Sequence, residues 1–197
     1  KGYNASAMVA PNENIPTILV AFGATGDLMR RKVIPALYYL YEKNELPTMF
    51  RVVGFSRRDL TDETFADFVV TAISDHQKKE VSKRDLASFL KIFRFQRGDF
   101  DESESYVALK ALFDTLDTEW GVCSNKLFYL SVAPEYYETI FKQLTASRLS
   151  EPCAPGGGWM RVMVEKPFGV DTETARELDL LLGQYFEENQ IYRIDHY

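Results

Sequence analysis

Residues 17–32, TILVAFGATGDLMRRK, constrain the fold of this chain more than any other segment. An apolar, β-prone run ends in a glycine turn at Gly23 and Gly26, and a basic, helix-prone segment follows directly. This order places backbone N–H groups and the positive end of a helix dipole where they can hold a pyrophosphate. The spacing is GxxG rather than G-x-G-x-x-G, so the turn by itself also fits a strand-to-helix connection without a ligand. It indicates a parallel α/β fold, with a nucleotide as the first candidate ligand.

Apolar runs and amphipathic segments alternate along the rest of the chain. The runs are apolar on both faces, which is typical of parallel strands covered by helices. We therefore predict an α/β, Rossmann-like, doubly wound, mostly parallel sheet with helices on both faces over residues 17–197, after a flexible arm over 1–16. Pro35 predicts a kink or a break in the first helix. Strands are expected near 18–22, 51–56, within 91–100, and near 126–133, 161–166 and 191–194, and helices near 26–43, 61–73, 83–92, 103–118, 134–147 and 172–186.

Composition excludes several classes of partner. The net charge of −6 argues against a nucleic-acid-binding surface. No apolar run approaches the roughly 20 residues that span a bilayer, and the polar start of the chain has no signal-peptide core, so we expect a cytoplasmic protein without a membrane partner. Cys123 and Cys153 lack metal-ligand spacing and are expected to be two free thiols, with no metal site. His76 lies in the polar stretch DHQKKE and is expected to be solvated.

Arginines follow the second predicted strand, in Ser56-Arg57-Arg58. In this architecture the end of that strand approaches the adenosine ribose, where an acidic residue binds a 2′-hydroxyl and an arginine accommodates a 2′-phosphate. Arg57 therefore favours NADP over NAD. The alternative is a solvated surface pair balanced by Asp59 and Asp62.

Other polar residues stand at later strand ends, where ligands bind in parallel sheets. Tyr129 lies in the strand before the small residues at 132–134 and fits either the core or the sheet edge. Lys166 follows a buried strand and precedes Pro167, so it is held at the edge, where it can donate to a phosphate or a sugar hydroxyl. The last strand leads into Asp195 and His196, whose side chains should point to opposite faces and not pair with each other.

Five strings occur together in one order: GATGDLMRRKVIPALYYLY, GFSRRDLT, LFYLSVAP, VEKPFG and QIYRIDHY. In sequence and separation they resemble the coenzyme domain of the glucose-6-phosphate dehydrogenase family, from about residue 17 to residue 197. The resemblance implies oxidation of glucose 6-phosphate at C1, with hydride transfer to NADP⁺. It also implies a homodimer or homotetramer formed through a separate C-terminal β+α domain that is absent from this chain.

The resemblance also assigns roles to individual residues. Asp195 would be the catalytic contribution of this chain, because it would orient a separate histidine that acts as general base and lies beyond Tyr197. The segment alone should then bind without turnover. The implied substrate-binding residues are Lys32, Lys166, His196 and Tyr197. The implied cofactor-binding residues are Gly23, Ala24, Thr25, Gly26, Asp27, Leu28, Met29, Arg30, Arg57, Tyr129, Lys166 and Pro167.

Two alternative functions stay open at this point. One is a non-catalytic NADP-binding module, such as a sensor or interaction domain. The other is a different two-domain sugar oxidoreductase with a Glu-Lys-Pro string after a strand. An organellar location addressed by a C-terminal signal is a further alternative to the cytoplasm.

Overall fold

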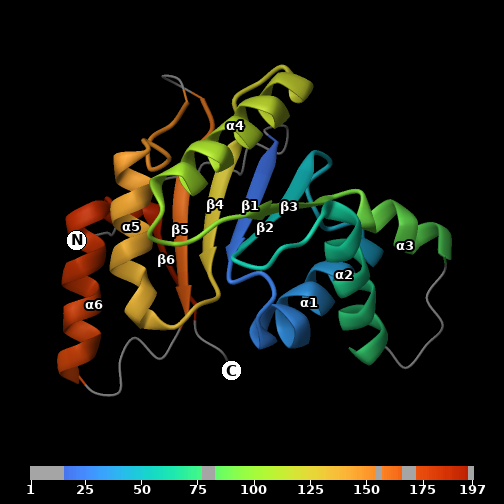
Figure 1. Cartoon of the computed structure of the whole chain (residues 1–197), viewed down its shortest axis with the longest axis horizontal. Helices are drawn as coiled ribbons and strands as arrows, with labels where there is room; N and C mark the ends of the chain where they lie inside the picture. Colours follow the sequence, from blue (N-terminus) through green and yellow to red (C-terminus); the bar gives the residue numbers. More distant parts are fainter. Residues whose placement is uncertain (1–15, 77–82, 154–156, 166–171, 195–197) are drawn as a thin grey trace, which may run out of the picture.

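A parallel β-sheet forms the centre of the computed structural model, which describes residues 16–76, 83–153, 157–165 and 172–194. Within these residues the sheet has six strands in the order β3-β2-β1-β4-β5-β6, and every neighbouring pair is parallel (Figure 1). The predicted Rossmann-like fold is therefore confirmed. The predicted arm over 1–16 lies outside the described residues, apart from Pro16. The strands are β1 (Thr17–Phe22), β2 (Phe50–Ser56), β3 (Phe93–Arg97), β4 (Asn125–Leu130), β5 (Met160–Glu165) and β6 (Ile191–Ile194).

Helices cover both faces of this sheet (Figure 1). In β1, Ile18, Val20 and Phe22 pack toward α4–α6, whereas Leu19 and Ala21 pack toward α1–α3, because successive strand residues face opposite sides. Both sets are buried, which explains why the strand is apolar throughout. The helices are α1 (Ile34–Glu42), α2 (Asp62–His76), α3 (Lys83–Leu90), α4 (Ser103–Trp120), α5 (Tyr137–Ala146) and α6 (Thr172–Tyr185), with 3-10 turns η2 (Pro134–Tyr136) and η3 (Glu188–Gln190).

The first helix is irregular before its proline rather than at it. A π-helical turn, η1 (Met29–Val33), leads directly into α1, and the Ile34 N–H donates to the Met29 carbonyl. Pro35 has no N–H for an ordinary i−4 bond, and a wider turn makes room for its ring. The helical path continues to Glu42, so the predicted disturbance is present without a break.

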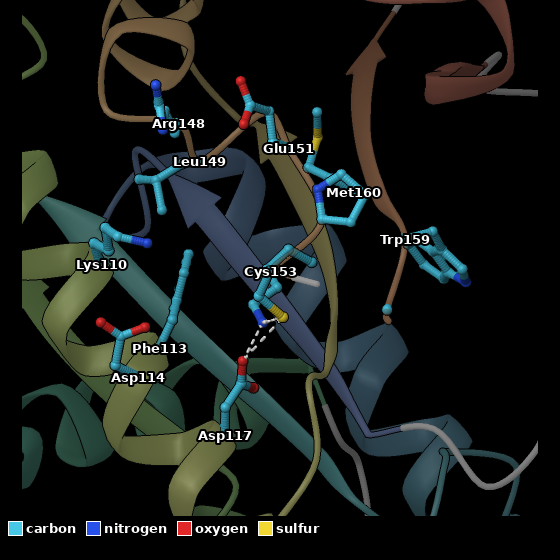
Figure 2. Close-up of a pocket in the computed structure, with 13 residues that line it drawn as sticks. Lys110, Phe113, Asp114, Asp117, Arg148, Leu149, Glu151, Cys153, Trp159 and Met160 are labelled. Atoms are coloured by element: carbon cyan, nitrogen blue, oxygen red, sulfur yellow. Dashed lines mark hydrogen bonds and ion pairs between the residues drawn. The ribbon is translucent and has the colours of Figure 1, made fainter. Parts of the chain in front are cut away.

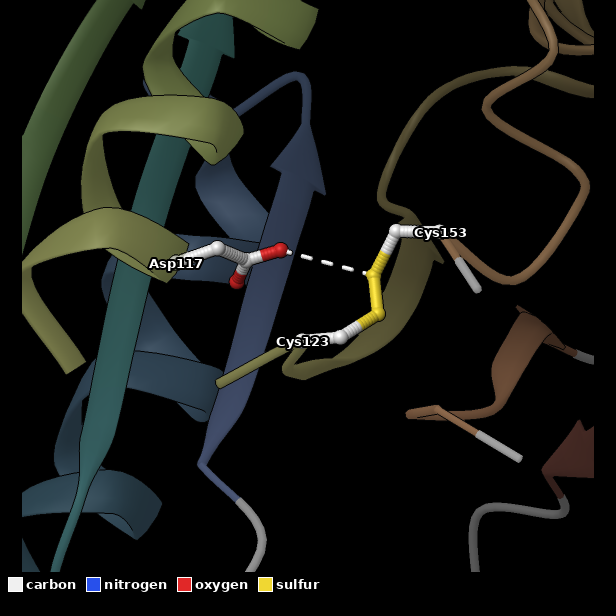
Figure 3. A group of neighbouring side chains, drawn as sticks. All are labelled: Asp117, Cys123 and Cys153. Carbon is white, nitrogen blue, oxygen red and sulfur yellow. Dashed lines mark hydrogen bonds between the residues drawn. A yellow bond between two sulfur atoms is a disulfide. The ribbon is translucent and has the colours of Figure 1, made fainter. Parts of the chain in front are cut away.

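The two cysteines are not free thiols, so that prediction was wrong. Cys123 and Cys153 form a disulfide across a sequence separation of 30 residues (Figure 3). The spacing of the two cysteines in the sequence does not show that they are close in space. They are close because β4 and β5 pair in parallel with Lys126 opposite Met160. The segments that enter these two strands therefore lie side by side, each carrying one cysteine. None of the helices in the described part of the chain combines the length and the apolar character that a membrane-spanning helix needs.

Candidate coenzyme site

The glycine turn connects β1 to the first helix at the carboxyl edge of the sheet. Gly23 has φ +78°, and its N–H donates to the Phe55 carbonyl at 2.9 Å. The Gly26 N–H donates to the Gly23 carbonyl at 2.9 Å, and the Arg30 N–H then donates to the Gly26 carbonyl at 3.1 Å. The first amides of a helix have no acceptor within the helix, so this end presents N–H donors to an anion.

This turn lies at the point where the strand order reverses, between β1 and β4. A Cβ on residue 23 would lie 2.4 Å from the Ser131 carbonyl oxygen and 2.7 Å from Val132 Cγ1, so only glycine fits this approach. The Ser131 hydroxyl is buried and has no hydrogen-bond partner among the described residues. Ligands of doubly wound sheets bind in this crevice, so the close turn and the unpartnered hydroxyl fit a dinucleotide.

Side chains of the turn segment are divided between the core and the surface. Ala24 and Met29 are fully buried, so any contact they make with a coenzyme runs through their backbone. The Asp27 carboxylate pairs with Arg31 at 2.8 Å, and Arg30 pairs with Asp75 of α2 at 2.5 Å. The pairing with Arg31 offsets the negative charge that Asp27 brings to the phosphate side of the turn. Leu28 is partly buried against the core beside Met29.

Arg57 follows β2 and keeps 63% of its side chain exposed, with its Nε 3.9 Å from the Asp99 carboxylate. The carboxylates of Asp59 and Asp62 do not balance the arginine pair: Asp59 lies 3.3 Å from Arg97, and Asp62 accepts from the Phe95 N–H at 2.6 Å. The Thr25 hydroxyl donates to the Ser56 hydroxyl at 3.4 Å, which joins the glycine turn to the end of β2. Arg57 is therefore beside the turn with its guanidinium largely in solvent.

Tyr129 is 3% exposed, and its hydroxyl donates to the Glu165 carboxylate on the neighbouring strand. Burial, together with this hydrogen bond, raises the pKa of Tyr129 well above its ordinary value. Burial likewise raises the pKa of Tyr137 to about 12, with the Glu165 charge adding to the effect. The phenol of Tyr129 is thus held protonated, as a donor.

Lys32 and Tyr129, which the sequence assigns to different ligands, line one cavity together with Glu165. This cavity of about 650 Å³ runs between α1 and the β4–β5 side of the sheet, and the rest of its wall is mainly apolar. Sequence reasoning assigned no role to Glu165 or Ser131. Glu165 stood within the EKPFG string, but its bond to Tyr129 depends on the β4–β5 register, which pairs Tyr129 with Met163.

Five further predicted site residues lie outside the described residues: Lys166, Pro167, Asp195, His196 and Tyr197. The last described residues before them, Glu165 and Ile194, are paired across β5 and β6. His76 is exposed, as predicted.

Comparisons with known proteins give consistent results. The sequence profile described as "Glucose-6-phosphate dehydrogenase, NAD binding domain" matches residues 20–197. The chain is 38% identical over 182 residues to glucose-6-phosphate 1-dehydrogenase 2 of Mycobacterium tuberculosis, and 41% identical over 180 residues to glucose-6-phosphate 1-dehydrogenase of Streptococcus pneumoniae. These alignments cover 92% and 91% of this chain but 35% of each relative, so the chain spans about a third of their length.

Solved structures show the same similarity. A structure described as glucose-6-phosphate dehydrogenase in complex with its substrate glucose-6-phosphate superposes with a TM-score of 0.79 at 30% identity, over 93% of this chain and 37% of that one. The enzyme from Mycobacterium avium superposes with a TM-score of 0.77 at 30% identity, over 91% and 36% of the two chains.

Proposed function

The chain belongs to the glucose-6-phosphate dehydrogenase family and contains its NAD-binding domain, and from this premise we propose that it binds NADP and supplies the coenzyme half of an enzyme that oxidises glucose 6-phosphate at C1. The observation that carries the proposal is the crevice between Gly23 and Ser131, with Arg57 beside it. When bound, NADP⁺ would accept the hydride that leaves C1. Family membership favours this reading over the other Glu-Lys-Pro sugar oxidoreductases considered from the sequence.

The residues of this chain bind and orient rather than remove the proton. The first amides of the helix, between Gly26 and Arg30, hold the pyrophosphate, because the Gly23, Gly26 and Arg30 N–H groups already donate within the chain. Arg57 takes the 2′-phosphate. Tyr129, fixed by Glu165, lies along the coenzyme, and Lys32 supports the sugar side of the same cavity. We assign Lys166 and Pro167 to coenzyme binding, and Lys166 also to substrate binding. His196 and Tyr197 complete the substrate contacts that this chain offers, and Asp195 orients the general-base histidine.

The remaining part of the enzyme supplies that histidine, the rest of the sugar pocket and the contacts between subunits of a homodimer or homotetramer. The protein works in the cytoplasm. Because general-base catalysis contributes about 10²–10⁴-fold, the 197-residue chain alone binds NADP without measurable turnover.

Arg57 gives the sharpest test of the coenzyme. Titration of NADP⁺ and NAD⁺ against Arg57→Ala should show NADP⁺ binding weakened about 10- to 100-fold, since a charge-assisted contact contributes roughly 1.5–3 kcal/mol. NAD⁺ affinity should stay within about twofold of the unchanged chain. Arg58→Ala is the matched control and should change both affinities little. Equal weakening of both coenzymes by Arg57→Ala contradicts the 2′-phosphate role.

The catalytic part of the proposal needs the intact protein. Glucose 6-phosphate and NADP⁺ should together yield NADPH, followed by the absorbance of the reduced nicotinamide. Coenzyme binding without NADPH formation would instead support the non-catalytic module.

A further inference from the structure

A second polar site lies at the amino edge of the sheet, opposite the glycine turn. It is a cavity of about 210 Å³ between α4, the start of β4 and the segment that leads into β5 (Figure 2). One wall carries Cys153, which is joined to Cys123 by the disulfide (Figure 3). The charged residues around it are Lys110, Asp114 and Asp117 from α4, Lys126 from β4, and Arg148 and Glu151 from the segment after α5.

Asp117 organises this site. One of its carboxylate oxygens accepts from the Ser124 N–H at 3.0 Å and from the Ser124 hydroxyl at 2.5 Å. The other accepts from the Lys126 ammonium at 2.6 Å and lies 3.6 Å from the Cys153 sulfur. Lys126 is only 9% exposed, so its charge is held inside the protein beside this carboxylate.

Each N–H donor of the Lys126 ammonium group has a neighbouring acceptor atom in this site. An ammonium group has three N–H donors. Two of them have oxygen acceptors, on Asp117 at 2.6 Å and on the Ser124 carbonyl at 3.0 Å. The third has the Cys153 sulfur as its neighbour, at 3.7 Å. A disulfide sulfur accepts hydrogen bonds weakly, whereas a thiolate is a strong, charged acceptor, so this contact strengthens only when the S–S bond opens.

The two segments joined by the disulfide are also held together without it. The Lys126 N–H donates to the Trp159 carbonyl at 2.8 Å, and the Trp159 N–H donates to the Asn125 side chain at 3.0 Å. Gly158 lies so close to Ser124 that a Cβ there would be 2.2 Å from the Ser124 carbonyl oxygen. We therefore expect β4 and β5 to stay paired when the S–S bond opens. Cys153 is exposed and Cys123 is half-buried.

We propose that Cys123–Cys153 is a thiol-exchange site that reacts with small thiols of the glutathione class while the protein stays folded. The thiolate of the small thiol attacks the Cys123 sulfur, and a new S–S bond forms there. The Cys123–Cys153 bond breaks, and its electron pair goes to the Cys153 sulfur. The resulting thiolate accepts a hydrogen bond from the third N–H of Lys126. A second small thiol then attacks the mixed disulfide and leaves Cys123 as a thiol, with a small-molecule disulfide as the other product.

Exchange with reduced glutathione tests the proposal on the intact, oxidised protein in native buffer. After rapid trapping with N-ethylmaleimide, peptide mass mapping should find glutathione on Cys123 and maleimide on Cys153. Far-ultraviolet circular dichroism should stay unchanged during the reaction. Glutathione on Cys153 with maleimide on Cys123, or no exchange before the protein unfolds in urea, would overturn the proposal.

Two substitutions test the charges separately. Lys126→Met should slow exchange about 3- to 10-fold, because it removes a charged donor to the departing sulfur whose effect is only partly expressed in the transition state. Asp117→Asn keeps the shape but removes the negative charge 3.6 Å from that sulfur, so it should accelerate exchange. If either variant does not fold, the mapping on the unchanged protein still decides the question. If both variants exchange with glutathione at the same rate as the unchanged protein, Lys126 does not have the proposed role.

Discussion

The two glycines of the β1 turn should respond very differently to alanine, although the sequence motif treats them alike. At Gly23, alanine should lower the free energy of unfolding for two reasons. The left-handed backbone, with φ +78°, costs about 1–2 kcal/mol for a residue with a Cβ. That Cβ would also lie 2.4 Å from the Ser131 carbonyl oxygen, and overpacking of this kind costs about 1–3 kcal/mol. Loss of freedom in the unfolded chain offsets about 0.4–1 kcal/mol. The net destabilisation should be about 1–4.5 kcal/mol.

At Gly26 the nearest atom to an added Cβ is the Gly23 carbonyl oxygen at 3.1 Å, which a small shift relieves. We expect Gly26→Ala to change the free energy of unfolding by less than about 1 kcal/mol. Gly121 provides the matched control, since it has φ +69° but no atom within 4 Å of an added Cβ. Gly121→Ala therefore reports the backbone cost less the same unfolded-chain offset, about 0–1.6 kcal/mol, without the contact with Ser131.

Urea unfolding of the three variants, followed by circular dichroism, measures these free energies. The difference between Gly23→Ala and Gly121→Ala isolates the contact with Ser131. If Gly23→Ala is no more destabilising than Gly121→Ala, β1 and the end of β4 are not in close contact and the crevice is not formed as described. If Gly26→Ala is as harmful as Gly23→Ala, the assignment of the strained position is wrong.

Two further predictions concern stability away from this turn. Burial raises the pKa of Tyr106, Tyr129 and Tyr137, the last to about 12, so their stabilising effect is complete below pH 10 and is lost as pH rises from 10 toward 12. The free energy of unfolding, obtained from urea curves at pH 8 to 11, should fall above pH 10 by up to about 1.4 kcal/mol per pH unit for each tyrosine. Tyr137→Phe should reduce that slope, and a slope that it leaves unchanged contradicts the assignment. Gly158→Ala should destabilise the chain by about 1–3 kcal/mol, because its Cβ would lie 2.2 Å from the Ser124 carbonyl oxygen, and a urea midpoint like that of the unchanged chain would contradict this packing.

The fold was predictable because its signals are local. The run from Thr17 to Phe22 is apolar at every position but the first, which indicates a strand buried on both faces, and the glycine turn after it directs the chain into a helix. Arg57 could be placed at the edge of the crevice from its position after a strand alone. The π-helical turn before Pro35 was not predictable, since a proline signals a disturbed helix without saying which turn absorbs it.

Contacts between strands could be identified only from the structure, because the sequence of a single strand does not determine the register in which it pairs with its neighbour. Tyr129 had two readings from sequence, core or sheet edge, and the structure joins them: the ring is buried while the hydroxyl reaches Glu165. That bond is a diagonal contact, two residues beyond the Tyr129–Met163 pair. A shift of the register by one residue would turn Glu165 to the opposite face and remove it.

Residues that meet at the carboxyl edge of the sheet can be predicted from the sequence, whereas those that meet at the amino edge cannot. At the carboxyl edge, the topology of a doubly wound sheet brings the ends of β1 and β4 to one crevice, so the residues after each strand can be assigned before any contact is known. At the amino edge, no such rule applies to the segments that enter the strands. Lys126, Asp117 and Cys153 meet there only because β4 and β5 pair with Lys126 opposite Met160. Chemistry at that edge therefore follows from strand register, and a disulfide beside a buried lysine cannot be recognised from the spacing of two cysteines.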